Sequence, residues 1–506
     1  MKELRSEQEK AAYLEDESRL HGSADAVFLP AGEAQIRTLL RRFPTQPITV
    51  QGARTGVAGG AVPSSGLVFC LERMNRILDL HTEEQTAVVE PGLPLAVLQR
   101  ELRRHGLFFP PDPTETTASI GGMAANDSSG ARSFHYGSTR RFITALHVLL
   151  ADGSLLRLRR GEHRCRDGHF CLRTDDGRIL RGELPRLPVP AAAKNTAGYY
   201  LRPDMDLIDL FLGSEGTLGI ITRLTLRLLP LPRFTGGAVL FLPREEAVLP
   251  LVESLRGRRA ADLPSRPLAL EFFGRDALAL MRETGQNGSA LRAQSPVPAA
   301  ADGALYVEFC GDDRTRLCDA LIASGRRLAE AGGDPALTWA AVSARDLARL
   351  KDFRHAAPVS VNEEIARLRQ EHPHITKVGT DMAVPDRCLA GIYHLYRNDL
   401  ARSGMRSAVF GHIGNNHLHV NILPRSDEEY RRARALHTRW AASAAAMGGT
   451  VSAEHGIGKL KTWLLRQQYS REDLAAMREL KKIFDPHFRL GPGTIFAAEP
   501  AEAENE

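Results

Sequence analysis

The chain lacks the cysteine pattern of a metal–sulfur cluster. Its 506 residues include six cysteines but no CxxC pair. This spacing argues against an iron–sulfur or zinc cluster held by cysteines, and it is typical of a protein in a reducing compartment. We therefore expect a cytoplasmic protein.

Signals for export and membrane insertion are also lacking. The first 20 residues are charged throughout and contain no apolar signal core. No long uncharged apolar run follows, so no spanning helix is predicted. The arginine-rich stretch at residues 157–160 is typical of a solvated face, although peripheral contact with the inner face of a membrane stays open.

Neither charge sign dominates. The 66 Lys and Arg residues face 61 Asp and Glu, and the formal net charge of +5 is modest for this length. It does not indicate a nucleic-acid partner. The 43% hydrophobic and 25% charged fractions are those of a soluble globular protein, and the length predicts two or three domains.

Two common nucleotide-binding motifs are absent: no GxGxxG opens a helix, and no GxxxxGK[ST] occurs. Three other glycine-rich segments are present, at residues 51–60, at 110–130 with Tyr136-Gly137 after it, and at 213–222. Glycine permits close backbone approach, and successive exposed N–H groups bind anions. Any one segment would be an ordinary turn, but three together predict a dinucleotide site.

Hydrophobic periodicity predicts an α+β chain. Towards the N-terminus we expect helices at 35–43, 95–105 and 206–212, strands at 48–50, 67–71, 86–90 and 224–228, and a hairpin of 143–150 with 155–158. After a boundary at Pro230 and Pro232, strands at 238–242, 268–273 and 305–309 alternate with helices at 316–331 and 386–403, which indicates a mainly antiparallel sheet. Helices at 427–447 and 462–483 and an acidic, disordered tail follow.

The segment VFGHIGNNHLHVNIL, residues 409–423, concentrates histidines in an apparently buried hairpin. If Asn415-Asn416 forms a two-residue turn, His412 lies directly opposite His419. Their Cβ atoms would be about 4.5–5.5 Å apart, close enough for both rings to bind one divalent cation. Strand alternation would place His417 and Asn421 on the face of His419. We expect Glu454 as the third ligand and His417 as a core or supporting residue. Two histidines and a carboxylate suit Zn²⁺, with Mn²⁺ or Fe²⁺ as alternatives.

Several motifs together resemble one flavoprotein family. They are PITVQGARTG at 47–56, SIGGM at 119–123, GSEGTLG at 213–219, GHIGNNHLHVNI at 411–422, SAEHGIGK at 452–459 and DPHFRLGPGTIF at 485–496. The combination is similar to the vanillyl-alcohol oxidase (PCMH-type FAD-binding) family, in its D-lactate, D-2-hydroxyglutarate and glycolate dehydrogenase branch. The resemblance extends over nearly the whole chain.

The resemblance implies a PCMH-type FAD-binding domain of two α+β subdomains over residues 1–232. A substrate cap domain would cover 233–425, C-terminal helices at 426–498 would complete the FAD and active site, and 499–506 would be the disordered tail. The implied cofactor-binding residues are Gly52, Ala53, Arg54, Thr55, Gly56, Pro111, Asp112, Ser119, Gly121, Gly122, Asn126, Gly130, Tyr136, Gly137, Glu215, Gly219, Ile220 and Ile221. The first loop has no histidine, so we expect noncovalent FAD.

The resemblance also implies roles in catalysis. His412, His419 and Glu454 would bind the metal, and His455 would be the general base. The remaining implied substrate contacts are Arg354, which would hold a carboxylate through paired hydrogen bonds, Lys377, for which a surface charge is the equal alternative, and Asn421.

The chain departs from the family pattern at three places. It has Asn415-Asn416-His417 where Asp-Gly-Asn is usual, Pro358 where a threonine is frequent, and Gly491-Pro492-Gly493-Thr494 where Asn-Pro-Gly-Lys is frequent. The change at Pro358 falls in the expected substrate pocket, so the sequence leaves the acid undetermined.

We therefore predict an FAD-dependent dehydrogenase that oxidises a D-2-hydroxy acid to the 2-oxo acid. The reduced flavin would pass electrons to an external acceptor, either a quinone, an electron-transfer flavoprotein or an iron–sulfur subunit, and a homodimer is one expected assembly. The alternatives are a flavin oxidase that uses O₂, a metal-dependent hydrolase, and a non-catalytic flavoprotein subunit. The sequence does not decide the metal, the acceptor or the oligomeric state.

Overall fold

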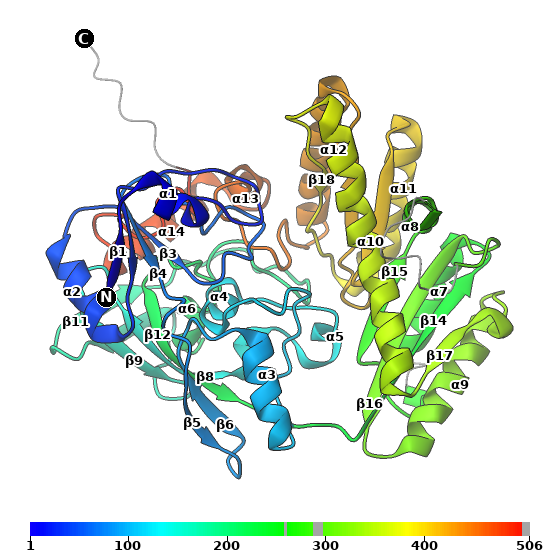
Figure 1. The fold of residues 1–506 in the computed structure, drawn as a ribbon, viewed down its shortest axis with the longest axis horizontal. Coiled ribbons are helices and arrows are strands. Elements are labelled where there is room, and N and C mark those ends of the chain that lie inside the picture. Colours follow the sequence, from blue (N-terminus) through cyan, green and yellow to red (C-terminus); the bar gives the residue numbers. More distant parts are fainter. Residues whose placement is uncertain (258–260, 287–296, 498–506) are drawn as a thin grey trace.

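The computed structural model describes residues 1–257, 261–286 and 297–497. It combines helices with largely antiparallel sheets, which confirms the expected α+β class. The strands form two larger sheets and a smaller one, with two short two-stranded ribbons beside them. Figure 1 shows the N-terminal sheets in one half of the molecule and the seven-stranded sheet in the other.

A four-stranded sheet opens the chain. Its order is β1 (Lys2–Leu4), β2 (Ala26–Leu29), β4 (Leu67–Cys70) and β3 (Ile48–Gln51). β2, β4 and β3 run parallel, and β1 is antiparallel to β2. Helix α2 (Glu33–Arg42) buries its apolar stripe of Ile36, Leu39 and Leu40 against this sheet. The first glycine-rich segment leaves the sheet at the end of β3.

A five-stranded antiparallel sheet follows, in the order β5 (Ile77–His81), β6 (Thr86–Val89), β12 (Ile220–Arg227), β8 (Ile143–Leu149) and β9 (Leu155–Arg159). The predicted hairpin of β8 with β9 is confirmed. The helices of this part of the chain are α3 (Leu95–Arg104), α4 (Ile120–Asn126), which packs against β12, α5 (Ser133–Tyr136), which contacts β15 (Ala269–Phe273) of the other half, and α6 (Ile208–Phe211). Helix α6 has four residues, so the helix expected at 206–212 is shorter than predicted. The ribbons are β10 (His169–Arg173) with β11 (Ile179–Glu183), and β7 (Leu107–Phe108) with β13 (Leu229–Pro230).

The second half is built on a seven-stranded sheet whose pairings are all antiparallel, as predicted. Its order is β17 (Trp339–Ala341), β14 (Phe234–Leu242), β16 (Gly303–Gly311), β15 (Ala269–Phe273), β19 (Ser407–Gly411), β20 (His419–Ile422) and β18 (Val378–Gly379). Its helices are α7 (Val248–Arg256), α8 (Arg275–Gln286), α9 (Arg314–Glu330), the 28-residue α10 (Ala344–Glu371) and α11 (Leu389–Ser403).

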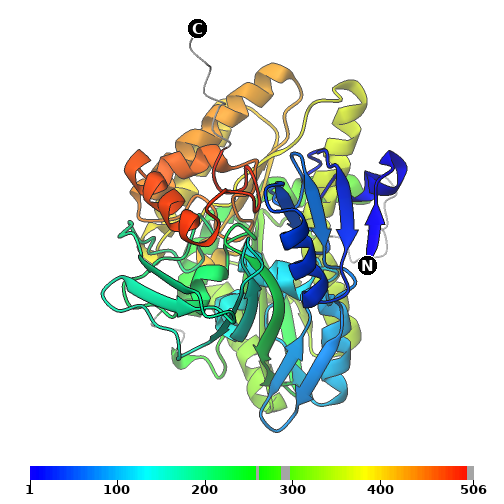
Figure 2. The same ribbon diagram turned by 90° about the vertical axis from the view of Figure 1, so that its left-hand side faces the viewer.

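The C-terminal segment returns to the first half. Helix α12 (Asp427–Ala446) packs against α11 and α13 (Thr462–Gln468), and α14 (Arg471–Phe484) packs against β11 of the first half (Figures 1 and 2). The single helix expected at 462–483 is wrong. Helix α13 ends at its C-cap, Tyr469, and Ser470 caps the start of α14 through a reciprocal capping box with Asp473. Leu490 then bridges Ile48 of β3.

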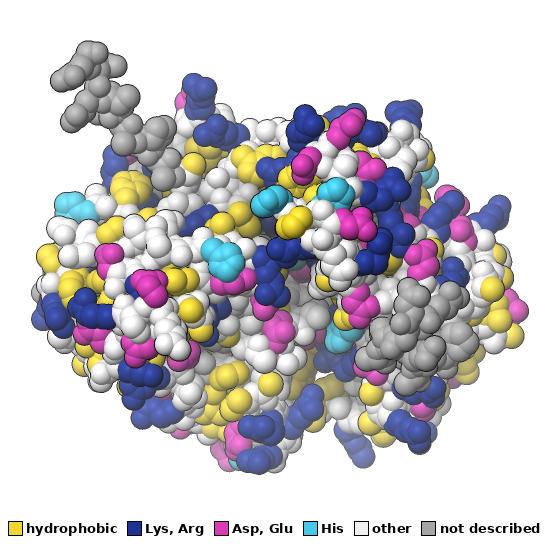
Figure 3. Space-filling model, turned by 45° about the horizontal axis from the view of Figure 1, so that its top comes forward, with side chains coloured by type: hydrophobic (Ala, Val, Ile, Leu, Met, Phe, Trp, Pro, Cys, Tyr) yellow, Lys and Arg dark blue, Asp and Glu magenta, His cyan; other side chains and the backbone are white. Residues whose placement is uncertain are grey.

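Two further expectations can be compared with the structure. Within the described ranges, no helix is both long and apolar enough to cross a lipid bilayer. On the face shown in Figure 3, basic and acidic side chains are interspersed, in keeping with the near balance of charge in the sequence. The domain limits at 232, 425 and 498 stay predictions, and the tail at 499–506 lies outside the described residues.

Candidate active site

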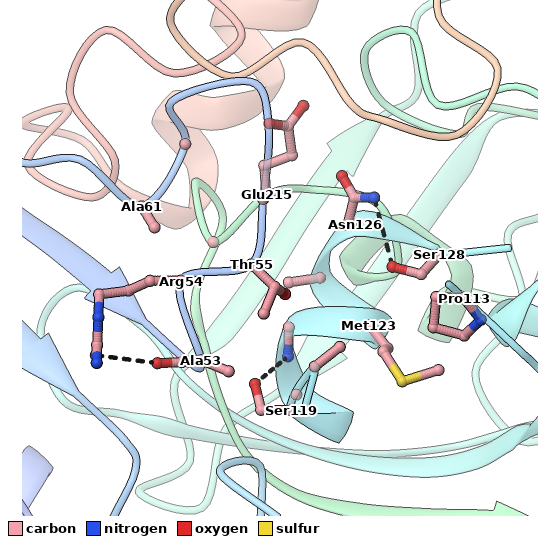
Figure 4. A pocket seen from close by; sticks show the side chains of 18 of the residues that line it. Ala53, Arg54, Thr55, Ala61, Pro113, Ser119, Met123, Asn126, Ser128 and Glu215 are labelled. Atoms are coloured by element: carbon pink, nitrogen blue, oxygen red, sulfur yellow. Dashed lines mark hydrogen bonds between the residues drawn. The ribbon is translucent and has the colours of Figure 1, made fainter. Parts of the chain in front are cut away.

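The three glycine-rich segments line one cavity of about 370 Å³. That volume is suited to a small-molecule or cofactor site. Figure 4 shows Thr55 from the first segment, Ser119 and Asn126 from the second, and Glu215 from the third around it. Among the predicted cofactor-binding residues, those in its wall are Gly52, Ala53, Arg54, Thr55, Gly56, Ser119, Gly121, Gly122, Asn126, Gly130, Glu215, Gly219, Ile220 and Ile221.

Close backbone approach explains why glycine is required at two of these positions. A Cβ on Gly52 would lie 2.1 Å from Ser119 Oγ, and a Cβ on Gly121 would lie 2.4 Å from Cβ of Pro91. Ser119 caps α4, because its hydroxyl accepts a hydrogen bond from Gly122 N at 3.3 Å. The backbone of the first segment is therefore packed against the Ser119 side chain at the start of α4, and the backbone of α4 is packed against Pro91.

At Arg54 the backbone conformation and the contacts of the guanidinium point to different parts of the protein. The φ of Arg54 is +61°, a left-handed conformation of the kind found in backbone turns that bind anions. The guanidinium packs over the Tyr13 ring at 4.8 Å and lies 3.6 Å from Glu72 Oε2. Its charge is therefore shared with residues outside the predicted cofactor loops.

Four predicted cofactor residues are not among the lining residues of this cavity: Pro111, Asp112, Tyr136 and Gly137. Asp112 lies one layer behind the wall, because a Cβ on Gly130 would meet its carbonyl oxygen at 2.1 Å. The Tyr136 hydroxyl lies 3.7 Å from Cys310 Sγ, on strand β16 of the other half. Asp112 therefore supports the wall, and Tyr136 joins the two halves.

A cluster of histidines and carboxylates borders the cavity, whose lining includes His412, Glu454 and His455. Nε2 of His412 lies 3.2 Å and Nε2 of His419 lies 3.3 Å from the same Oε1 of Glu454. The outer ring nitrogens contact protein oxygens: His412 Nδ1 is 2.8 Å from Glu271 Oε1, and His419 Nδ1 is 3.2 Å from the carbonyl of Thr380. The three predicted metal ligands thus converge.

The hairpin register that led to this prediction is wrong. His419 pairs with Phe410, and Ala408 pairs with Asn421, so the ladder is shifted by two positions from the expected one. Residues 412–418 form a longer connection, with a short 3₁₀ turn at Ile413–Asn415 and Asn416 in a left-handed conformation. Arg256 stabilises this connection by donating to the carbonyls of Ile413 and Gly414. The rings of His412 and His419 still meet, with centroids 5.4 Å apart.

The cluster carries strong electrostatic coupling. Burial alone would lower the pKa of His412, but the flanking carboxylates of Glu271 and Glu454 raise it to about 9. Burial would raise the pKa of Glu454, and the charges of His412 and Lys194 outweigh it, so this pKa falls well below its usual value. The site therefore concentrates negative charge that needs cations around it.

Sequence analysis missed several groups that complete this site. Lys194 Nζ lies 2.8 Å and Ser129 Oγ 3.1 Å from Glu454 Oε2, both from the N-terminal half. Asp381 accepts hydrogen bonds from the backbone N–H groups of Glu454 and His455. One sequence signal existed: Glu271 is a lone carboxylate in the apolar strand ALEFF, a position that usually needs a charged partner.

The donor set fits a divalent cation. The outer contacts of His412 and His419 suit Nδ1–H tautomers, which would leave both Nε2 lone pairs directed at one carboxylate oxygen. Without a metal ion, protonated His412 donates from Nε2 to Glu454, and a divalent cation would replace that proton and accept both Nε2 lone pairs. Nitrogen and carboxylate donors in this number suit Zn²⁺ and other first-row divalent ions.

Among the predicted substrate residues, Arg354 is linked to this cluster through Glu271, which contacts both Arg354 and His412. Arg354 Nη1 is 3.9 Å from Glu271 Oε2, and Arg354 Nη2 donates to His355 Nε2 at 2.9 Å. Lys377 Nζ donates to Asn362 Oδ1 at 3.1 Å, on the same helix as Arg354. Asn421 is buried, and its Nδ2 has no hydrogen-bond partner within the described ranges.

His455 lies between the cavity and the cluster. Its ring stacks on His419 with centroids 5.4 Å apart, and its side chain is 32% exposed towards the space it lines. Nδ1 is 3.6 Å from Asp381 Oδ2. Burial among protein atoms lowers the pKa of His455 to about 4, so the ring is neutral near pH 7.

Comparisons with known proteins agree with a flavin site. The family described as "FAD linked oxidases, C-terminal domain" matches residues 232–495, more than half of the 506 residues, and the "FAD binding domain" family matches residues 24–159. The chain belongs to the FAD-linked oxidase family. It is an FAD-linked oxidoreductase, and the cavity between the glycine-rich segments is where this family's cofactor is expected.

Full-length relatives narrow the branch of this FAD-linked oxidase family. The chain is 28% identical to "Glycolate oxidase subunit GlcD" of Bacillus subtilis, over 94% of this chain and 89% of the relative. It is 29% identical to "D-2-hydroxyglutarate dehydrogenase" of Xanthomonas citri, over 94% and 90%. The expected resemblance to the glycolate, D-lactate and D-2-hydroxyglutarate branch is confirmed at this level.

Solved structures confirm the fold. The 4-ethylphenol oxidase from Gulosibacter chungangensis has a TM-score of 0.66 at 17% identity, with 98% of this chain and 94% of that one covered. p-Cresol methylhydroxylase has a TM-score of 0.66 at 15% identity, with the same coverage. The PCMH-type fold predicted from the sequence is therefore correct.

Proposed function

We propose that the chain oxidises a D-2-hydroxy acid to the 2-oxo acid with FAD, in the manner of a dehydrogenase. The observation that carries this proposal is the shared wall: His412, Glu454 and His455 line the same cavity as the three glycine-rich segments. A cation-binding cluster and a flavin pocket that share residues can act on one small substrate. The names of the relatives support a hydroxy acid as that substrate.

Noncovalent FAD would be held by the loops at Gly52–Gly56 and Ser119–Gly122 and by the residues around Glu215. Glu215 connects this wall to the catalytic segment, because its carboxylate accepts the backbone N–H of Ile457 at 2.8 Å and of Gly458 at 2.7 Å. When bound, FAD supplies the acceptor for the hydride that leaves C2 of the substrate.

His455 would take the hydroxyl proton while the hydride leaves C2. An imidazole is suited to this step, and the ring is held by stacking on His419 and by its backbone N–H donated to Asp381. His412, His419 and Glu454 would hold a divalent cation, Zn²⁺ in our assignment, which supplies positive charge beside the substrate hydroxyl.

Arg354, Lys377 and Asn421 would bind the substrate carboxylate and orient it. Asn421 Nδ2, which has no hydrogen-bond partner in the described part of the chain, supports a ligand contact, because a buried donor without a partner costs free energy. Arg354 is adjacent to Glu271, so it would align the carboxylate relative to His412. The reduced flavin would be reoxidised by an external quinone, electron-transfer flavoprotein or iron–sulfur subunit, and a homodimer is compatible with the proposal.

An anaerobic bleaching screen tests this function. Paired D- and L-2-hydroxy acids are added to the flavin-loaded protein, and loss of the oxidised flavin absorbance is followed. We expect reduction by a D-acid or by glycolate, and His455→Gln should slow it by about 10²–10⁴-fold. His487→Gln, at an exposed position, is the matched control and should not change the rate.

Each alternative function predicts a different result in this screen. Stoichiometric peroxide under air would indicate an oxidase. A purified protein that stays colourless when given FAD would favour a metal-dependent hydrolase. A flavoprotein that no 2-hydroxy acid bleaches would be a non-catalytic subunit. Either of the last two results would overturn the proposal, and peroxide release would overturn its assignment as a dehydrogenase.

A further inference from the structure

His417 is a fully buried imidazole that lacks satisfactory hydrogen bonds. Its ring is 0% exposed, and neither nitrogen has a well-aligned partner within the described part of the chain. Nε2 lies 3.1 Å from Asp381 Oδ1, but at a poor angle, and Nδ1 lies 3.9 Å from Glu454 Oε2. A buried polar group left in this state destabilises the fold unless something else binds it.

The ring belongs to the cation cluster. Its centroid is 4.3 Å from that of His419 and 5.4 Å from that of His412. One donor atom from each of His412, His417, His419 and Glu454 can be chosen so that all four lie within 4.8 Å of one another. The sequence predicts that His417 is a core or supporting residue, and its position among these donors makes it a candidate ligand as well.

The connection that carries His417 is held in place from several sides. Asn416 Nδ2 donates to Asp386 Oδ1 at 2.7 Å, and Ser133 Oγ donates to Asn415 Oδ1 at 3.3 Å. Ala383 forms a β-bridge with His417 itself. The ring is thus fixed beside the cluster, and a preorganised side chain loses little freedom when it binds a ligand.

We propose that His417 is a third imidazole ligand, which makes the cation site one of three histidines and one glutamate. This assignment rests on the proposed cation at His412, His419 and Glu454. Nδ1 would face the cation, and Nε2 would face Asp381, the same outer-oxygen arrangement as in the other two rings. A third nitrogen donor favours Zn²⁺ or Co²⁺ over the harder ions Mn²⁺ and Mg²⁺.

A second donor group overlaps this one, in which Asp381 and His455 join His419 and Glu454. The oxygens of Asp381 are already engaged, because Oδ2 accepts from Ser452 Oγ at 2.6 Å and from Lys461 Nζ at 2.9 Å. Backbone N–H groups of Glu454 and His455 also donate to this carboxylate. Nδ1 of His417 has no hydrogen-bond partner within the described residues, so we assign the fourth position to it.

Direct metal binding, without turnover, tests this inference. Apoprotein is titrated with Zn²⁺ against a chromogenic chelator, and Co²⁺-substituted protein is examined by visible absorption. His417→Asn should weaken Zn²⁺ binding by at least about tenfold, change the Co²⁺ bands, and narrow the preference for Zn²⁺ over Mn²⁺. His437→Asn is the matched control, since His437 is also a buried ring without hydrogen bonds within the described ranges, and it lies outside the cluster.

The outcomes separate this inference from the proposed function. If His417→Asn retains FAD but binds Zn²⁺ as tightly as the wild type, with unchanged Co²⁺ bands, the third ligand is refuted and the His412–His419–Glu454 site stands. If the wild type binds no divalent ion, both assignments fail. If His417→Asn loses FAD or folded structure, His417→Gln is measured instead, with the same expected loss of Zn²⁺ affinity.

Discussion

Replacing Gly52 by alanine should disturb the cofactor loop before any cofactor binds. The added Cβ would lie 2.1 Å from Ser119 Oγ, closer than two such atoms can approach. Either the first loop or the start of α4 must move, and the cap that Ser119 provides for Gly122 N would weaken. Overpacking of this kind costs about 1–3 kcal/mol, and loss of a helix cap costs about 1 kcal/mol.

The assay compares Gly52→Ala with Gly56→Ala in the same loop. A Cβ on Gly56 would meet no protein atom within 4 Å, so this variant should leave the apoprotein as stable as the wild type or slightly more stable. We expect Gly52→Ala to lower the melting temperature of the apoprotein. If the overpacking cost of about 1–3 kcal/mol destabilises the loop conformation that binds FAD, the FAD dissociation constant should rise about 5- to 150-fold, as measured by flavin fluorescence.

Two results would refute this reasoning. The first is an apo melting temperature that is equal in Gly52→Ala and wild type, because the predicted contact does not depend on the cofactor. The second is an equal loss of apo stability in both alanine variants, which would mean that the loop tolerates no side chain for reasons other than Ser119.

Three further predictions concern other elements. Burial lowers the pKa of His437 from 6.5 to about 3, so as the pH falls between these values the unfolded state binds a proton that the folded state does not, and the free energy of unfolding decreases by up to about 1.4 kcal/mol per pH unit. In His437→Leu, urea unfolding at several pH values should show a weaker decrease of stability at acid pH. A pH dependence equal to that of the wild type would contradict this. Gly458 has φ +52° and its Cβ would lie 2.0 Å from the carbonyl of Ala58, so Gly458→Ala should release bound FAD on gel filtration, and full retention would count against the packing. Arg256→Met removes donors to the 412–418 connection and should lower the melting temperature, with a loss of about 1–3 kcal/mol, and reduce bound zinc measured by mass spectrometry; retained zinc would show that the connection positions itself.

Many of the helices and strands could be predicted from the sequence, because its local hydrophobic and turn patterns agree with the tertiary structure. The stripe of Ile36, Leu39 and Leu40 predicts α2, and the hairpin of β8 with β9 follows from its Asp152-Gly153 turn. The break at Tyr469 was missed because apolar periodicity continues across it, and only the Ser470 capping box marks the new start. The glycine-rich segments predicted their common cavity because glycine is needed where two backbones or a backbone and a cofactor come close.

The sequence identified those site residues that belong to short motifs, and it missed those that join the site only through long-range contacts. His412, His419 and Glu454 could be chosen by donor type and motif, although the hairpin register used for the first two was wrong. Lys194 and Glu271 could not be paired with them, since they come from segments far apart in the sequence. A long-range ion pair leaves no periodic trace in either segment.

By itself, the sequence determined the α+β class, the phosphate-binding loop chemistry and the donor types available for a cation, because these depend on side-chain identity and short-range spacing. Only the tertiary structure decided which donors converge. The two-residue shift in the β19–β20 ladder placed His412 and His417 in the connection instead of on paired strands, and packing between the halves brought Lys194 and Ser129 to Glu454. Such convergence depends on long-range packing, which fixes atoms to within an ångström and which no local pattern encodes.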